Sequence, residues 1–307
     1  ATVGPIWGCC DRLVRIPTDR RAALPRSSIM DGARRTRRAP GAEVPGGHDE
    51  GTEARMAGDG LLYRVYERRL SKELESFDLP QHLGVIVDGN RRWAKAAGES
   101  TAQGHRAGAA KIVEFLSWCE DLGIPLVTVW MLSTDNLRRP PEELVALYEI
   151  IASTIEQITD AGYCVRLTGS ADSLPEEMRE GIDRLQQETS PEARLTVNVA
   201  IGYGGREEIV HAVRELVRDL GAQGKGIEEI AEGISVGAIA EHLYTRGQPD
   251  PDLIIRTSGE QRLSGFLLWQ SVHSEYWFCE TYWPGFRRID LLRALRDFCR
   301  RERRYGA

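Results

Sequence analysis

Short apolar runs alternate with helix-like patterns along the chain from residue 60 onward. Apolar residues recur at helical spacing between Leu61 and Leu70, and strand-length runs of uninterrupted apolar residues follow at intervals. The predicted strands are 83–87, 126–132, 164–167, 195–201 and 252–256, with further candidates at 266–269 and 276–278. The predicted helices after Leu70 are 112–119, 140–158, 175–187, 206–220 and 290–304. This alternation predicts an α/β fold with a mainly parallel sheet flanked by helices.

Residues 1–59 lack this alternation. The segment 1–55 contains ten arginines and seven acidic residues, is rich in Gly and Pro, and shows no sustained hydrophobic period. Such a composition is typical of disorder, so we expect a disordered leader over 1–59 and a single folded domain over 60–307. Met56 stands just before the organised part and could be a natural start, with 1–55 a translated upstream extension. Alternatively, the leader is a basic arm that brings the protein to an anionic membrane surface.

Composition narrows the class of protein. Hydrophobic residues make up 41% and charged residues 28% of the 307 residues, as in soluble globular proteins. The net charge of −6 argues against general nucleic-acid binding, which usually needs a basic surface. No apolar run approaches the roughly 18 residues of a membrane-spanning helix, and the N-terminus lacks the apolar core of a signal peptide. The six cysteines form no CxxC pair, so we expect reduced thiols in a cytoplasmic protein.

The first predicted strand ends in the sequence DGNRR, residues 88–92. A carboxylate after a buried strand suits a metal or catalysis, the glycine lets the backbone approach a ligand, and paired arginines favour a phosphate. The alternative is that Asp88 caps a helix and that the arginines lie on a solvated face. The segment GHRAG at 104–108 could add donors to the same place, although a single histidine is more often structural.

Three later strand ends repeat this chemistry. They are STDN followed by RRP (133–140), YGGR (203–206) and RTSGEQRLS (256–264), and each alone could be an ordinary capping loop. Because ligands of such sheets bind beyond the carboxyl ends of the strands, the repetition in an acidic domain indicates a polyanion with two phosphates or diphosphates. Glu275 lies downstream and could join Asp88 around a hard cation such as Mg²⁺.

Common alternative motifs are missing from the sequence. It contains no Walker loop, Rossmann fingerprint, GxSxG elbow or HExxH, and no Cys/His zinc spacing. It also lacks the DDxxD box with which trans-prenyl synthases hold a magnesium diphosphate.

Together, these segments resemble the signatures of the cis-prenyltransferases, the undecaprenyl diphosphate synthase family. The resemblance covers about residues 79–306 in the family's order, and the leader lies outside it. The matching segments are 82–94, 104–108, 133–136 with 139–140, 198–206, 252–270 with 274–275, and the closing residues 304–306.

The resemblance implies a parallel six-stranded sheet, a homodimer, and Mg²⁺-dependent cis-condensation of isopentenyl diphosphate with an allylic diphosphate. It implies that Asp88 and Glu275 hold the metal and that Asn136, with Ser133, lies where the condensation proton is removed. The closing segment would reach across the dimer toward the partner's site. The residues that it assigns to substrate binding are Gly89, Asn90, Arg91, Arg92, Trp93, His105, Ser133, Thr134, Asp135, Arg139, Arg256, Arg262, Leu263 and Ser264.

Three positions indicate a short product. Thr101 and Leu137 stand where long-chain members carry Arg and Trp, and Met131 stands where they carry a small residue. Together with the sequence of residues 258–270, these positions resemble the actinobacterial Z-farnesyl diphosphate synthases. We therefore expect the product (2Z,6E)-farnesyl diphosphate, made from geranyl diphosphate. Met131, by strand alternation on the side of Ser133, would limit chain length together with Leu137. The alternatives are a medium- or long-chain synthase and, more remotely, a non-catalytic partner subunit of the same fold.

Overall fold

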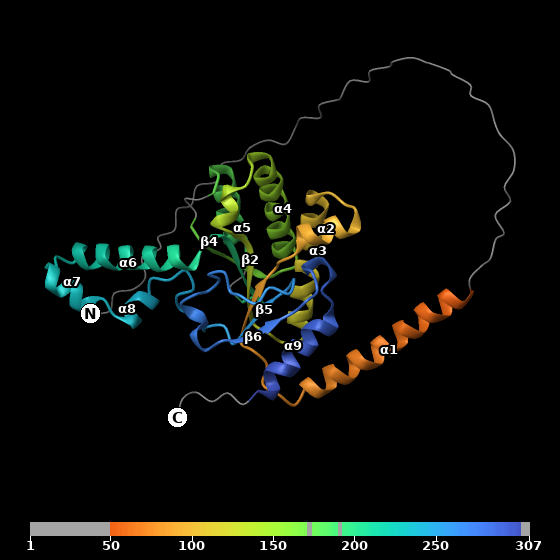
Figure 1. The fold of residues 1–307 in the computed structure, drawn as a ribbon. Helices are drawn as coiled ribbons and strands as arrows, with labels where there is room; N and C mark the ends of the chain where they lie inside the picture. Colours follow the sequence, from red (N-terminus) through yellow and green to blue (C-terminus); the bar gives the residue numbers. More distant parts are fainter. Residues whose placement is uncertain (1–49, 171–173, 190–191, 302–307) are drawn as a thin grey trace, which may run out of the picture. The chain divides into compact units, whose positions relative to one another are not determined.

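The computed structural model of the chain describes residues 50–170, 174–189 and 192–301 (Figure 1). Apart from Glu50, these residues belong to one compact unit, Gly51–Ala307. Residues 1–49 of the predicted leader and the closing segment 304–306 lie outside the described residues.

Each predicted helix and each of the first five predicted strands is present, although their bounds differ. The helices are α1 (Glu50–Leu74), α2 (Asn90–Ala97), α3 (Thr101–Asp121), α4 (Pro141–Asp160), α5 (Glu176–Glu188), α6 (Gly205–Ala222), α7 (Ile227–Gly233), α8 (Val236–Ala240) and α9 (Arg288–Arg300). The strands are β1 (His82–Ile86), β2 (Leu126–Ser133), β3 (Cys164–Thr168), β4 (Thr196–Tyr203), β5 (Leu253–Arg256) and β6 (Glu275–Phe278). Short 3₁₀ helices include η1 (Asp135–Arg138), η3 (Gln270–His273) and η4 (Trp283–Gly285).

The six strands form one sheet in the order β3-β4-β2-β1-β5-β6, and every neighbouring pair is parallel. This confirms the predicted parallel sheet. The chain moves from β1 toward one edge through β2 and later returns to the other side of β1 with β5. Ligands of open α/β sheets bind at such a reversal, beyond the carboxyl ends of the central strands. The topology therefore directs attention to the ends of β1, β2 and β5.

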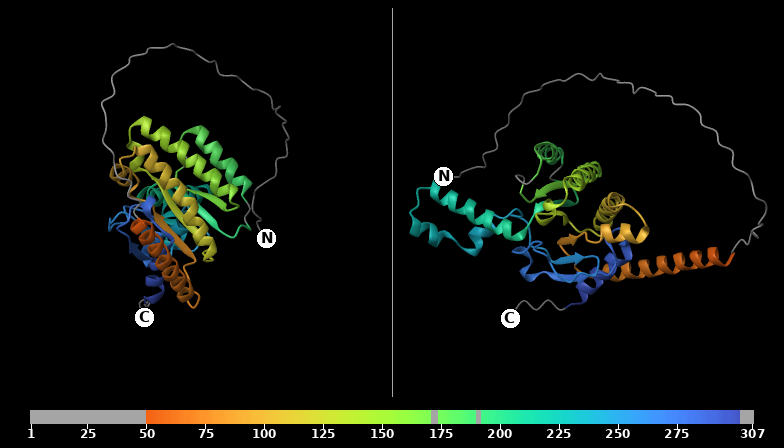
Figure 2. Two further views of the ribbon diagram at one scale, coloured as in Figure 1. Left: turned by 90° about the vertical axis from the view of Figure 1, so that its right-hand side faces the viewer. Right: turned by 45° about the horizontal axis from the view of Figure 1, so that its top comes forward.

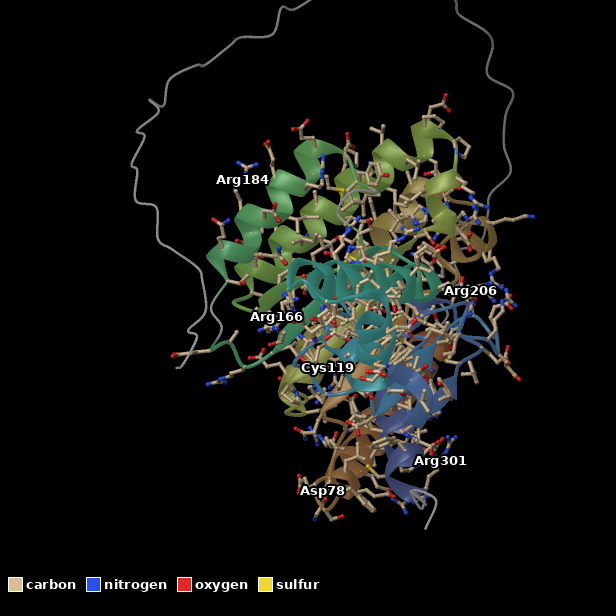
Figure 3. All side chains as sticks on the ribbon, turned by 90° about the vertical axis from the view of Figure 1, so that its left-hand side faces the viewer. Asp78, Cys119, Arg166, Arg184, Arg206 and Arg301 are labelled. Carbon is tan, nitrogen blue, oxygen red and sulfur yellow. The ribbon has the colours of Figure 1, made fainter. Side chains whose placement is uncertain are left out.

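One face of the sheet carries the main hydrophobic core. The apolar faces of α3, α4, α5 and α9, with the end of α1, pack on alternate residues of the strands, such as Val85, Val129 and Val199. Helices α3, α4 and α5 lie side by side over this face (Figure 2). Burial raises the pKa of the Cys119 thiol, which lies inside this core (Figure 3). The described cysteines are all free thiols.

The opposite face is covered largely by loops. A smaller cluster of Trp130, Tyr203, Phe266 and Leu267 packs there. The strand predicted at 266–269 is wrong, because these residues form a turn that buries Phe266 and Leu267, and Leu267 has φ +44°. An apolar run records burial but not backbone conformation, so a turn folded onto the sheet has the same pattern as a strand.

Helix α1 also differs from the sequence prediction, because it begins at Glu50 rather than near Leu61. The sequence of its first turns contains helix formers such as Glu, Ala, Arg and Met but no apolar stripe. Hydrophobic periodicity therefore could not predict this part of the helix. Among the residues described, no helix is both long and apolar enough to span a membrane.

Candidate active site

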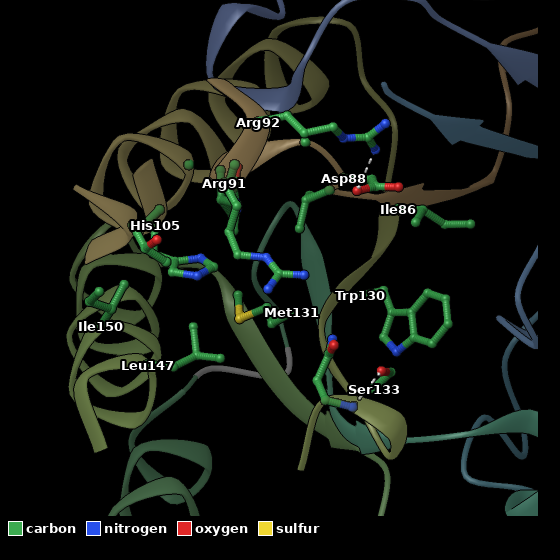
Figure 4. A pocket seen from close by; sticks show the side chains of 18 of the residues that line it. Ile86, Asp88, Arg91, Arg92, His105, Trp130, Met131, Ser133, Leu147 and Ile150 are labelled. Atoms are coloured by element: carbon green, nitrogen blue, oxygen red, sulfur yellow. Dashed lines mark hydrogen bonds and ion pairs between the residues drawn. The ribbon is translucent and has the colours of Figure 1, made fainter. Parts of the chain in front are cut away.

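A cavity of about 890 Å³ opens at the carboxyl ends of β1, β2 and β5, bordered by α2, α3, α4 and the loop after β5 (Figure 4). It has two chemically different parts. The polar mouth consists of Asp88, Arg91, Arg92, Arg256, Glu260, Arg262 and Ser264. The apolar wall consists of Ala109, Ile112, Met131, Leu147, Ile150 and Ile151.

Gly89 is the last of the three residues that connect the end of β1 at Ile86 to the start of α2 at Asn90. Its φ is +107°, and a Cβ atom here would lie 2.8 Å from a ring carbon of Tyr282. Only glycine fits this backbone at low cost. The turn places the N-terminal residues of α2, Asn90 and Arg91, against the cavity. Because the first amides of a helix have no partners within it, this end of α2 favours an anion.

The glycines of the 104–108 segment serve packing rather than ligand binding. A Cβ atom on Gly104 would lie 2.4 Å from the Asn90 carbonyl oxygen, and one on Gly108 would lie 2.5 Å from Asn90 Oδ1. Both positions let α3 approach α2 closely. That approach brings His105, the one residue of this segment predicted to bind substrate, to the cavity lining.

Asp88 is held between two arginines. Its Oδ2 accepts a hydrogen bond from Arg256 Nη2 at 2.9 Å, and its Oδ1 accepts one from Arg92 Nη2 at 3.2 Å. Burial raises the pKa of Asp88, but the hydrogen bond from Arg256 and the charges of both arginines outweigh burial, so the pKa lies below its usual value. The carboxylate is therefore ionised and oriented at neutral pH.

The loop after β5 completes the polar mouth. Arg256 is only 5% exposed and donates to Ser264 Oγ at 2.9 Å and to the Arg262 carbonyl oxygen. Arg92 donates to Ser258 Oγ at 2.7 Å. Ser258 and Ser264 have φ of +79° and +52°. Such left-handed conformations in non-glycine residues are uncommon and cluster at ligand-binding loops.

The end of β2 supplies a second polar group. Ser133 Oγ accepts a hydrogen bond from the backbone N–H of Asn136 at 3.1 Å, and Asn136 Oδ1 accepts one from Arg139 Nη2 at 2.9 Å. Arg139 Nη1 also donates to Glu143 Oε1 at 3.0 Å, and His105 Nε2 lies 3.8 Å from the same oxygen. Burial, together with the charges of Arg139 and Arg91, lowers the pKa of His105.

A β-bulge shapes the wall next to this group. The register of β2 with β4 shifts between Trp130 and Leu132, which leaves Met131 unpaired. Trp130, Met131 and Ser133 all line the cavity, although the bulge interrupts the strand alternation from which the position of Met131 was predicted. Met131 packs toward the α3 and α4 side, whereas Trp130 belongs to the cluster on the opposite face. The cavity therefore reaches both faces of the sheet.

Most of the predicted site residues line this cavity, but five do not. Trp93, Thr134, Leu137 and Leu263 are half-buried outside its lining. Glu275 begins β6 and pairs in register with Leu253, which is level with Leu83. Glu275 thus lies near the amino-terminal ends of the strands, whereas Asp88 lies at their carboxyl ends. The two are about five residues apart along the strand direction, or roughly 15 Å. There Glu275 pairs with Arg301.

The glycine-arginine segment after β4 is not part of the cavity lining either. Gly205 lies against the Gly265 carbonyl oxygen, 2.4 Å from where its Cβ atom would stand, and Arg206 is exposed on α6 (Figure 3). The segment supports the loop after β5 instead of binding a ligand. The prediction that all four strand ends meet one ligand is therefore wrong for this strand.

Several lining residues were not predicted. Lys95 lies one helical turn after Arg91, and Glu99 lies just before α3. Thr101, which the resemblance placed where long-chain members carry Arg, also lines the cavity. Glu260 pairs with both Arg92 and Arg262. The helical spacing from Arg91 could have indicated Lys95, whereas nothing in the sequence distinguishes Glu260 from a surface acid.

The described residues contain no group of three or more His, Cys, Asp or Glu side chains arranged to hold a metal. Mg²⁺ is commonly bound by one or two carboxylates together with substrate phosphates rather than by a protein cage. Asp88, held between the cavity-lining Arg92 and Arg256, fits a cation that arrives with a diphosphate.

Comparisons with known proteins agree with this geometry. Residues 86–306 match the prenyltransferase family model described as undecaprenyl diphosphate synthase. The chain is 56% identical over 246 residues to a (2Z,6E)-farnesyl diphosphate synthase of Thermobifida fusca, an alignment that covers 80% of this chain and 97% of the relative. It is 53% identical over 250 residues to a short-chain Z-isoprenyl diphosphate synthase of Mycobacterium bovis, covering 80% and 95%.

A solved structure is also similar. Lavandulyl diphosphate synthase from Lavandula x intermedia, in complex with dimethylallyl diphosphate, superimposes with a TM-score of 0.70 at 31% identity. The superposition covers 75% of this chain and 99% of that chain.

Proposed function

Because the chain belongs to the undecaprenyl diphosphate synthase family of cis-prenyltransferases, we propose that it condenses isopentenyl diphosphate with a short allylic diphosphate. The product is a short Z-prenyl diphosphate, most simply (2Z,6E)-farnesyl diphosphate made from geranyl diphosphate. Relatives at 56% and 53% identity carry short-chain names, which supports this choice.

One observation carries the proposal. A single cavity has an ionised carboxylate between two arginines at its polar mouth and aliphatic side chains along its other side. A prenyl diphosphate has the same division, with a polyanionic head and an apolar tail. A nucleotide or sugar phosphate would leave the apolar wall facing water.

The two diphosphates are assigned to two sides of the polar mouth. The allylic diphosphate lies at the N-terminal end of α2, near Gly89, Asn90 and Arg92, where free amides and a guanidinium meet it. The isopentenyl diphosphate is bound by Arg256, Arg262 and Ser264. The allylic hydrocarbon then runs along the apolar wall past Met131.

The reaction begins when the allylic carbon–oxygen bond breaks and the electron pair leaves with the diphosphate. The arginines and the α2 amides stabilise that charge as it develops. Mg²⁺ held by Asp88 and the allylic diphosphate would supply further charge neutralisation for the leaving group. The isopentenyl double bond attacks the allylic carbon, and C2 of the isopentenyl unit then loses a proton, beside Ser133 and Asn136, to the released diphosphate. The apolar wall keeps water from the cationic carbon.

We also propose a homodimer, as the family resemblance implies. Within one chain Glu275 lies far from Asp88, so a metal-binding role for Glu275 requires a second copy of the chain. Sedimentation of the purified protein tests the dimer.

The test of the function is incorporation of radiolabelled isopentenyl diphosphate into prenyl products. Purified protein with Mg²⁺ is expected to incorporate label with dimethylallyl, geranyl or farnesyl diphosphate as starter, and most efficiently with geranyl diphosphate. A chelator of divalent cations should stop incorporation. Failure to incorporate label with any starter would favour the non-catalytic subunit.

A further inference from the structure

The indole of Trp130 has a hydrogen-bond donor that no acceptor satisfies. The side chain lines the cavity and is 9% exposed, and within the described part of the chain its Nε1 atom is buried without a hydrogen-bond partner. Buried donors in folded proteins are nearly always paired, so an unpaired one on a side chain that lines a cavity is a candidate contact for a ligand atom. In Figure 4 the indole nitrogen points into the cavity, on the side of Ser133.

The ring is held so that this donor keeps its direction. Phe266 stacks on the indole with centroids 5.2 Å apart and an interplanar angle of 15°. Tyr203 packs edge-on at 6.3 Å and 86°. The bulge after Trp130 fixes the backbone at the same point. A rigid donor needs no reorganisation when a ligand binds, which is what an effective binding group requires.

The sheet register indicates which substrate meets this donor. Trp130 pairs with Ile86 on β1, and Ile86 pairs with Arg256 on β5. Register partners in a parallel sheet point to the same face, so Trp130 and Arg256 share the loop-covered face. The loop that brings Phe266 over the indole also carries Arg262 and Ser264. Met131 and the apolar wall lie on the other face.

We propose that Trp130 binds substrate, and that its Nε1–H donates a hydrogen bond to an oxygen of the diphosphate held by Arg256, Arg262 and Ser264. The donor adds a neutral, directed contact beside the charges of Arg256 and Arg262. It thereby favours isopentenyl diphosphate over the allylic substrate at this position. The inference rests on the proposed condensation activity.

The test removes the N–H while keeping the ring. Benzothienylalanine, in which sulfur replaces the indole N–H, is placed at position 130, and Trp130→Phe is made alongside it. We expect kcat/KM for isopentenyl diphosphate to fall roughly ten- to a hundredfold in both, because hydrogen bonds to charged groups contribute more than neutral ones. The KM for geranyl diphosphate should change less than about twofold, since the donor faces the other substrate.

Trp277→Phe is the matched control. Trp277 donates to Asp297 Oδ2 at 3.3 Å outside the cavity lining, so its loss should leave both KM values unchanged. An unchanged KM for isopentenyl diphosphate in the benzothienylalanine protein would overturn the proposal, and so would an equal loss for both substrates. If the wild type forms no prenyl product at all, the proposed function fails first, and this inference fails with it.

Discussion

The polar mouth and the apolar wall share one cavity but are built in different ways. Residues of the mouth come from segments that directly follow strands, and hydrogen bonds and ion pairs connect them, as in Arg256–Asp88–Arg92. Residues of the wall come from the middle of α3 and α4 and from the bulge of β2, where only packing positions them. A change in the mouth should therefore alter the rate of the chemistry, whereas a change in the wall should alter which product fits.

Asp88→Ala should have the largest effect. Loss of an oriented electrostatic group commonly costs on the order of a hundredfold or more in kcat, and this variant also leaves Arg92 and Arg256 without their shared partner. Steady-state kinetics at saturating Mg²⁺ measures it. Asp78→Ala removes an exposed carboxylate at the amino edge and should turn over normally. Near-normal turnover by the Asp88 variant would exclude its assigned role.

Arg256→Lys keeps the charge of the mouth but loses its geometry. Lysine cannot reach Asp88, Ser264 and the Arg262 carbonyl from one planar group, so we expect kcat/KM for isopentenyl diphosphate to fall about tenfold or more. Arg206→Lys is the control, because Arg206 also follows a strand end but lies outside the cavity lining. Equal behaviour of the two variants would mean that the strand-end arginines are interchangeable and would contradict the described site.

Met131→Ala tests the wall. Removing this side chain opens room beside Leu147 and Ile151, so products should shift toward chains longer than those of the wild type, with turnover changed only a few-fold. Chromatography of the dephosphorylated products measures the distribution. Met178→Ala removes a buried methionine outside the cavity and should lower the melting temperature without lengthening the product. An unchanged distribution in the Met131 variant would show that this residue is only core filler.

Arg139→Gln should give the smallest of these effects, a shift in the pH at which His105 titrates. Burial, then the charges of Arg139 and Arg91, lower the pKa of His105. Removing Arg139 removes one of the lowering causes, so the His105 midpoint should move to higher pH. An imidazole NMR titration measures it, with Arg106→Gln as the control because Arg106 is exposed on the same helix. A midpoint that stays fixed or falls would contradict the described cluster.

The mouth could be predicted from the sequence much better than the rest of the site. Asp88 follows the apolar strand β1 and Arg256 ends the apolar strand β5, and the ends of parallel strands meet at one edge, so sequence position alone places them together. Glu275 lies at the opposite edge because strand register depends on pairing that no local pattern records. Arg206 has the same local signature as Arg256, yet the loop after β4 turns toward Gly265 rather than the cavity.

The wall was predicted only in part. Strand alternation predicted that Met131 lies on the side of Ser133. Both residues line the cavity, but the β2–β4 bulge interrupts the alternation between them, and no local pattern indicated that Trp130 joins the same lining. The positions of Leu147 and Ile151 depend on how α4 packs on α3. The segment 104–108 was expected to add donors: its His105 lines the cavity, whereas Gly104 and Gly108 allow the close packing of α3 on α2. Packing between distant segments accounts for each of these differences.

The most direct test of the account is the length and geometry of the product formed from geranyl diphosphate and labelled isopentenyl diphosphate. If Met131 in the apolar wall limits chain length, we expect one addition and a fifteen-carbon (2Z,6E)-farnesyl diphosphate as the main product. Chromatography against Z and E standards of known length measures both properties. Main products of fifty carbons or more, or a new double bond of E geometry, would contradict the account.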